Sequence, residues 1–108
     1  MDSLGPGALA PYLIVAAILF AAGMLAITTR RNAIGVLIGL ELIFNAAALQ
    51  FAAYGRFAPS AADPQGQTAA VFVIVVAAAE AAVALALLFA VYRTFRDVDL
   101  DRTRELRS

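Results

Sequence analysis

Two glutamates stand alone inside long apolar stretches of this 108-residue sequence. Glu41 follows Arg31 by ten positions, and Glu80 precedes Arg93 by thirteen. In helices that rise about 1.5 Å per residue, the two carboxyl groups lie about 15 Å and about 20 Å from these arginines. An ionisable side chain that deep in a membrane costs about 2.5–3.5 kcal/mol on insertion scales, so its presence indicates a function. Burial favours the protonated form of a carboxyl group, and a nearby charge or water releases the proton, as a proton relay requires.

The residues around Glu41 predict a packed interior rather than a surface that faces lipid. Asn45 lies one helical turn beyond Glu41 on the same face and offers a hydrogen bond. Gly35 and Gly39 form a G-x-x-x-G pair just before Glu41, a spacing that lets another helix approach closely.

Glu80 lies within a run of small residues, AAAEAA over positions 77–82. This small face suits tight helix packing or a narrow file of water. A purely structural role, in which each glutamate hydrogen-bonds a neighbouring helix for assembly, is the alternative interpretation. Two glutamates at similar depth on adjacent antiparallel helices favour the relay over that alternative.

Three apolar segments must position these carboxyl groups. The sequence is 63% hydrophobic with a mean hydropathy of +0.85, whereas soluble domains are roughly 45–50% apolar. The segments span about residues 11–29, 33–54 and 69–92, each long enough to cross a hydrocarbon core about 30 Å thick. A connection rich in proline and glycine covers 55–68, and a charged tail covers 93–108. We therefore expect an all-α membrane protein, a single unit of three transmembrane helices, because no polar face exists to cover a soluble bundle.

The distribution of arginines predicts the orientation of the chain in the membrane. All eight basic residues are arginines, and seven of them lie in the first loop or the tail. These seven are Arg30, Arg31, Arg93, Arg96, Arg102, Arg104 and Arg107. Because cytoplasmic segments carry the excess of positive charge, we expect the N-terminus outside and the C-terminus in the cytoplasm. The acidic start at Asp2 and the long first apolar run argue against a signal peptide.

The sequence contains neither cysteine nor histidine. Disulfides, iron–sulfur clusters and histidine-ligated haem therefore cannot be built from this chain alone. A nucleophilic Ser–His or Cys–His pair is excluded for the same reason. If the protein takes part in redox chemistry, the cofactors must belong to partner subunits.

Short motifs follow one another along the chain in an order that is typical of one family. They are Arg30-Arg31-Asn32, Gly39-Leu40-Glu41 followed by Asn45-Ala46, Gly66-Gln67, Ala77-Ala78-Ala79-Glu80 and Leu85-Ala86-Leu87. Their order and spacing on a three-span chain of this length resemble the K subunit of proton-pumping NADH–quinone oxidoreductase, respiratory complex I. The resemblance extends from about Ala16 to Leu106.

The resemblance implies roles for five residues. Glu41 and Glu80 would belong to a chain of buried charged and polar residues along the membrane arm, as the catalytic residues of proton relay and coupling. Glu41 is expected to be the more critical of the two. Arg30 and Arg31 are linked to activity in the family, and Asn45 is expected to support Glu41.

The resemblance also implies the setting in which the chain works. It would be a non-redox subunit of a translocase, contributing buried carboxylates to proton translocation coupled to electron transfer from NADH to quinone. No cofactor or metal is expected on this chain; flavin and iron–sulfur clusters would lie on partner subunits. The expected neighbours are the antiporter-like N subunit, the J and A subunits and the lipid bilayer, without nucleic acid. The expected location is the bacterial inner membrane, as a multi-pass protein.

Other classes of protein share some of these features. The nearest alternative is the C subunit of a multisubunit sodium/proton antiporter, which has the same three-span ancestry. A small proton-coupled multidrug transporter also carries a membrane glutamate, but it needs four spans and aromatic residues around the acid. A rotor-ring subunit of the ATP synthase has two spans and one carboxylate, and an assembly factor would tolerate neutral residues at both glutamate positions.

Overall fold

The structure is a computed structural model that describes residues 6–57 and 64–107, and these residues are almost entirely helical. Its elements are the short 3-10 helix η2 (Pro6–Ala8) and the α-helices α1 (Leu9–Thr29), α2 (Ala33–Phe57) and α3 (Gln65–Arg107). All three α-helices are long and apolar enough to cross a membrane. The expectation of an all-α chain with three such helices is therefore confirmed.

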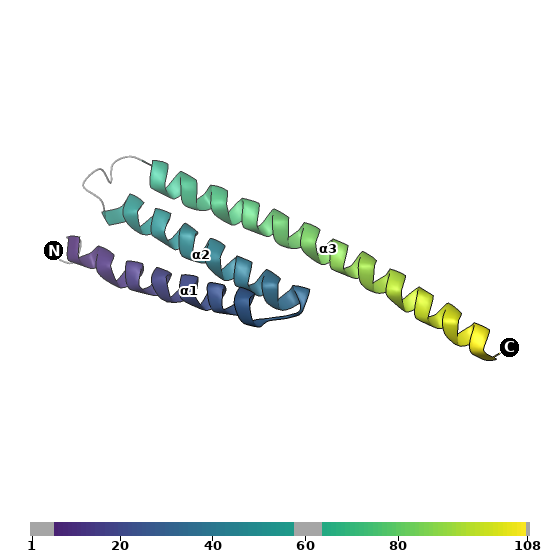
Figure 1. Ribbon diagram of the computed structural model, residues 1–108. Coiled ribbons are helices and arrows are strands. Elements are labelled where there is room, and N and C mark those ends of the chain that lie inside the picture. Colours follow the sequence, from purple (N-terminus) through teal and green to yellow (C-terminus); the bar gives the residue numbers. More distant parts are fainter. Residues whose placement is uncertain (1–5, 58–63, 108) are drawn as a thin grey trace.

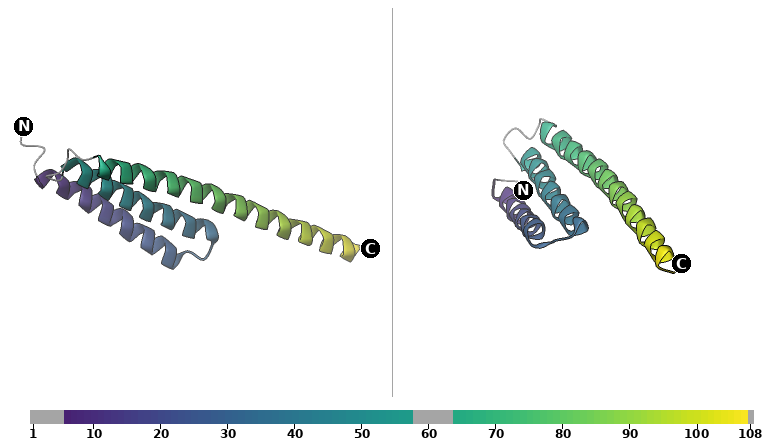
Figure 2. Two further views of the ribbon diagram at one scale, coloured as in Figure 1. Left: turned by 90° about the horizontal axis from the view of Figure 1, so that it is seen from above. Right: turned by 45° about the vertical axis from the view of Figure 1, so that its right-hand side comes forward.

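The three α-helices form a row in which α2 lies between α1 and α3 (Figure 1). Neighbouring helices run in opposite directions, and two further views show the same order (Figure 2). At one end, the rings of Tyr12 and Phe57 lie 5.3 Å apart and hold the start of α1 against the end of α2. The molecule is accordingly long and thin, with extents of 78 × 25 × 17 Å.

The helices run beyond the apolar segments identified in the sequence. α2 continues to Phe57 and α3 begins at Gln65, so part of the connection expected at 55–68 is helical, while 58–63 lie outside the described residues. The expected tail is a straight continuation of α3 as far as Arg107, about 21 Å past Arg93. Because no glycine or proline follows Gly66, the sequence contains no residue that ends a helix at the membrane surface.

The buried residues at the interfaces between the helices are small. In the described ranges they are Ala16, Gly23, Gly35, Gly39, Ala46, Ala48, Ala53, Ala70 and Ala77. Among the described residues no large side chain is fully buried; most large apolar side chains are exposed, and others, such as Ile27 and Ile43, are half-buried beside the glycines. Small residues let helix backbones approach closely in lipid, where burial of bulky apolar groups gives little driving force. The fold therefore depends on close backbone packing rather than on a core of large side chains.

Candidate functional site

Glu41 lies on the side of α2 that turns toward α3. Helical spacing places it near Leu37, which lines an apolar hollow shared with α3, and near the buried Ala48. The Glu41 side chain is half-buried, and its Oε1 atom is buried without a hydrogen-bond partner among the described residues. A buried carboxyl oxygen without a hydrogen-bond partner lowers the stability of the fold, so its presence at this position calls for a functional explanation.

Glu80 lies in the middle of the apolar part of α3, but it has a different environment. Its side chain is exposed, whereas Ala77, one turn earlier, is buried against the neighbouring helix. Helical geometry places Glu80 about 60° around α3 from Ala77, at the flank of the α2–α3 interface. The chain itself therefore does not cover this carboxyl group, although the group lies at a depth where exposure to lipid is costly.

The packing of α2 on α3 places the two carboxyl groups at the same level. Gly55 and Gly66 meet where the two helices come closest: a Cβ atom on Gly66 would lie 2.5 Å from Gly55 Cα. Glu41 precedes Gly55 by fourteen positions and Glu80 follows Gly66 by fourteen, so in antiparallel helices both lie about 21 Å from this contact. Farther along, Leu37 and Ala84 line one hollow of about 280 Å³.

These two contacts bracket the glutamates. The hollow lies one turn beyond them, and the glycine contact lies four turns before them. The similar depth expected from the arginine positions is thus matched by the register of α2 on α3.

Asn45 takes a different position from the one that its spacing suggested. It is exposed, and Oε1 of Glu41 accepts no hydrogen bond from it. A step of four residues turns the side chain by about 40° around the helix, which moves Asn45 away from the α3-facing side.

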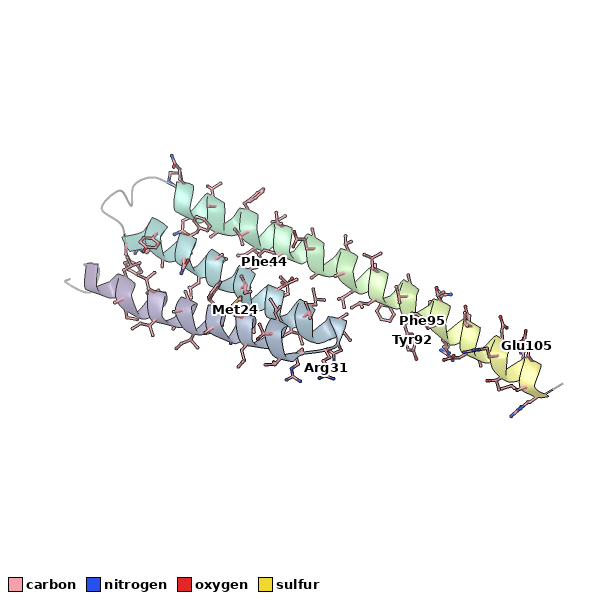
Figure 3. All side chains as sticks on the ribbon, in the orientation of Figure 1. Met24, Arg31, Phe44, Tyr92, Phe95 and Glu105 are labelled. Carbon is pink, nitrogen blue, oxygen red and sulfur yellow. The ribbon has the colours of Figure 1, made fainter. Side chains whose placement is uncertain are left out.

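Arg30 and Arg31 form the tight turn between α1 and α2. The Arg30 backbone N–H donates to Ala26 O at 3.0 Å and ends α1, and both arginine side chains are exposed. Figure 3 shows Arg31 at this turn, toward the end of the bundle where α3 reaches Tyr92. Because the turn lies about 15 Å from Glu41 along α2, the arginines are not brought into contact with the carboxyl groups.

Two structural roles were not recognised in the sequence. Asn32 caps α2, since its Oδ1 accepts the Gly35 backbone N–H at 2.7 Å; asparagine at the position before a helix is a known capping signal. The Gly35–Gly39 pair was expected to mark a helix contact. Gly39 does so with α1, since a Cβ atom there would lie 2.8 Å from Gly23 O, whereas Gly35 packs against Arg30 and Asn32 of the turn. The partner Gly23 and the Gly55–Gly66 contact were missed because isolated glycines have no pattern.

Little of the most apolar stretch of each helix is buried within the chain: 11% in α1, 22% in α2 and 6% in α3. A chain that covers so little of its apolar surface and carries acids at mid-span is a small multi-span membrane protein of the kind that works within a larger assembly.

Comparison with known proteins identifies the family. Residues 11–108 match the family of NADH-ubiquinone/plastoquinone oxidoreductase chain 4L, and the chain belongs to this family. It is 47% identical over 100 residues to NADH-quinone oxidoreductase subunit K 1 of Syntrophobacter fumaroxidans, covering 92% of this chain and 96% of that protein. It is 48% identical over 97 residues to subunit K of Desulfitobacterium hafniense, covering 86% and 88%. It is 46% identical over 96 residues to NAD(P)H-quinone oxidoreductase subunit 4L of a Synechococcus strain, covering 89% and 93%.

Family membership makes the chain a subunit of a NADH–quinone oxidoreductase, so its protein partners are other subunits of that complex. The resemblance stated from the sequence motifs is confirmed. The comparisons do not favour the antiporter alternative, and the three candidate membrane helices of the described residues are one fewer than the multidrug transporters need.

Proposed function

We propose that Glu41 and Glu80 are two stations of a proton relay in the membrane arm of the oxidoreductase. One observation carries the proposal: two carboxyl groups lie at one level of two adjacent antiparallel helices, each fourteen positions from the Gly55–Gly66 contact. Acids at this depth are costly and typically mark ion or proton pathways. The relay contributes to proton translocation that is coupled to electron transfer from NADH to quinone.

The different environments of the two acids support different tasks within the relay. Glu41, which has one carboxyl oxygen buried within the chain, is the station that relays protons inside the subunit. Glu80, exposed on the flank of α3, passes a proton to or from a group on another subunit. By the family resemblance, the neighbours are the antiporter-like N subunit and the J and A subunits.

The chain acts as a non-redox subunit of a translocase. Iron–sulfur clusters are held by cysteine thiolates, and this sequence contains no cysteine. Iron–sulfur clusters are therefore assigned to partner subunits, and by the family resemblance flavin is assigned there too, while NADH and quinone are substrates of the whole complex. Arg30 and Arg31, distant from the acids, support activity through the turn that anchors α1 and α2.

The arrangement of charges supports an orientation with the N-terminus outside and the C-terminus in the cytoplasm. The Arg30-Arg31 turn lies toward the same end of the bundle as the charged extension of α3, which begins after Tyr92 (Figure 3). Clustered arginines mark the cytoplasmic side of a membrane protein. The bacterial sources of the relatives support the bacterial inner membrane as the location.

Replacing both acids with glutamine tests the proposal, because glutamine keeps the size of glutamate but cannot ionise. We expect the complex with Glu41→Gln and Glu80→Gln to assemble, to lose proton pumping and to reduce quinone slowly. Oxidation of NADH by a soluble electron acceptor should stay normal, since it does not involve the membrane arm. Gln50→Ala is the matched control, because it changes an exposed polar side chain of α2 that is not acidic. Normal pumping by the double variant would contradict the relay.

A further inference from the structure

Gly55 and Gly66 make the closest backbone approach between α2 and α3 for which the structure gives distances. A Cβ atom on Gly66 would lie 2.5 Å from Gly55 Cα and 2.8 Å from Phe51 O. A Cβ atom on Gly55 would lie 2.9 Å from Gly66 Cα. The obstructing atoms belong to the backbone, which cannot rotate aside as a flexible side chain does. No other residue type fits at position 66 unless one helix moves.

A polar contact strengthens the same crossing. Gln67 Nε2 donates a hydrogen bond to the backbone oxygen of Ala52 at 3.1 Å. The bond joins α3 to α2 one residue past the glycine contact and is a second link between the two helices at this crossing.

The opposite half of the α2–α3 pair is open. There the two helices draw apart (Figure 2), and apolar hollows of about 380 and 280 Å³ lie between them. The first hollow lies between the start of α2, with its cap Asn32, and four residues of α3. The α3 residues are Leu85, Leu88, Phe89 and Tyr92. Loose packing in this half does little to fix the axial position of α3.

We propose that Gly55 and Gly66 are positioning residues, whose contact sets the register that holds Glu80 level with Glu41. This inference rests on the relay proposed above. Both acids lie about 21 Å from the contact along their helices. A side chain at position 66 would displace or slide α3, and the displacement would be carried along a straight helix to Glu80. Proton transfer needs donor and acceptor within about 2.6–3.2 Å, directly or through one water, so the relay is sensitive to such a shift.

The register is measured first, by cross-linking within the assembled complex. Leu37→Cys and Ala84→Cys place thiols on the two sides of one hollow, in a chain that has no cysteine of its own. We expect oxidation to link them in the parent background, as detected by mass spectrometry of the subunit. Gly66→Ala should strongly reduce the yield of this cross-link.

Gly23→Ala is the matched control for the cross-link. A Cβ atom there would meet Gly39 O at 2.7 Å, so this variant also has a backbone clash, slightly less severe than the one at Gly66, but the clash lies between α1 and α2. Since the α2–α3 crossing is not touched, the variant should leave the cross-link between α2 and α3 at the parent yield.

The functional measurement uses glycine variants that keep both acids and residues 37 and 84 as they are. In Gly66→Ala we expect proton pumping per NADH oxidised to fall by roughly tenfold to a hundredfold, the effect of a displacement of about 1 Å at a reacting site. Oxidation of NADH by a soluble acceptor should be unchanged. If Gly66→Ala does not assemble, Gly55→Ala is the milder test, because its Cβ atom meets the backbone at 2.9 Å.

The outcomes separate this inference from the relay itself. An unchanged cross-link yield in the glycine variants would overturn the positioning role, whatever the acids do. A reduced yield with normal pumping would also overturn it. Normal pumping after replacement of both glutamates by glutamine would instead remove the relay, and the cross-link result would then describe packing alone.

Discussion

At the scale of single residues, the two glutamates differ in how far their own chain buries the carboxyl group, and not in their level along the helices. Glu41 and Glu80 lie at one level, yet only Glu41 has a carboxyl oxygen that its own chain buries. A buried polar atom without a partner lowers stability, and natural proteins retain such groups mainly where function needs them. Glu41 is therefore a residue at which stability and activity should respond in opposite directions.

Replacement of Glu41 by leucine or glutamine separates these two responses. Both variants should lose proton pumping, because neither side chain ionises. Leucine removes the unpartnered oxygen, whereas glutamine leaves polar atoms in the same enclosed place, at a cost of about 1–3 kcal/mol. We expect the complex with Glu41→Leu to withstand higher temperatures than the complex with Glu41→Gln, measured as loss of the assembled band on native gels after heating. A Glu41→Gln complex as stable as Glu41→Leu would show that the enclosed oxygen has a partner in the assembly.

At the scale of elements, glycine contacts rather than bulky side chains hold neighbouring helices together. Gly23 and Gly39 join α1 to α2 near mid-span, and Gly55 and Gly66 join α2 to α3 near one end. The Gly23–Gly39 pair leaves α1 and α2 in contact along their length, whereas the Gly55–Gly66 pair lets α3 separate from α2 toward the other end. The face of α2 toward α1 is therefore packed along its length, and the face toward α3 is packed only in part.

A large side chain at Gly39 should disrupt the α1–α2 pair. A Cβ atom there would already lie 2.7 Å from Ile27 Cγ1 and 2.8 Å from Gly23 O. Overpacking of a close interface costs about 1–3 kcal/mol, so Gly39→Leu should lower the amount of subunit found in the assembled complex. Quantitative immunoblotting of native gels measures this amount. Gly7→Ala is the control, since a Cβ atom at Gly7 meets nothing within 4 Å; equal incorporation of both variants would contradict the interpretation.

The sequence allowed the number of helices, the turn between α1 and α2 and the close contact at Gly39 to be predicted, but not the ends of α3 or most of the contacts between helices. Long apolar runs indicate membrane spans, and each of the three expected segments lies in one helix. The end of α3 could not be inferred from hydropathy, because a helix can continue through polar residues and no glycine or proline interrupts this one. The depth of the two acids could be estimated because arginines mark one membrane face, whereas the faces on which Glu80 and Asn45 lie depend on how the helices rotate against one another.

At the scale of the whole molecule, the long α3 gives the chain a strongly asymmetric shape. Its last turns extend past α1 and α2 with Phe95 and Glu105 along them (Figure 3). From Ala90 to Arg107 every residue is exposed, and Leu106 retains 88% of its accessible surface. Positive and negative side chains are interspersed along this extension, as is typical of helices in contact with water or with a polar partner surface.

The orientation of the chain is accessible to chemical labelling. The absence of native cysteine means that a single introduced thiol reports its own side of the membrane. Gly7→Cys lies at the start of the chain, and Leu106→Cys lies at the far end of α3. If the arginine-rich end of the bundle faces the cytoplasm, as we propose, a membrane-impermeant maleimide should label Leu106→Cys in inside-out vesicles and Gly7→Cys in right-side-out vesicles. Mass analysis of the subunit after labelling identifies the modified residue. The reverse pattern would place the arginines outside and would contradict the proposed orientation.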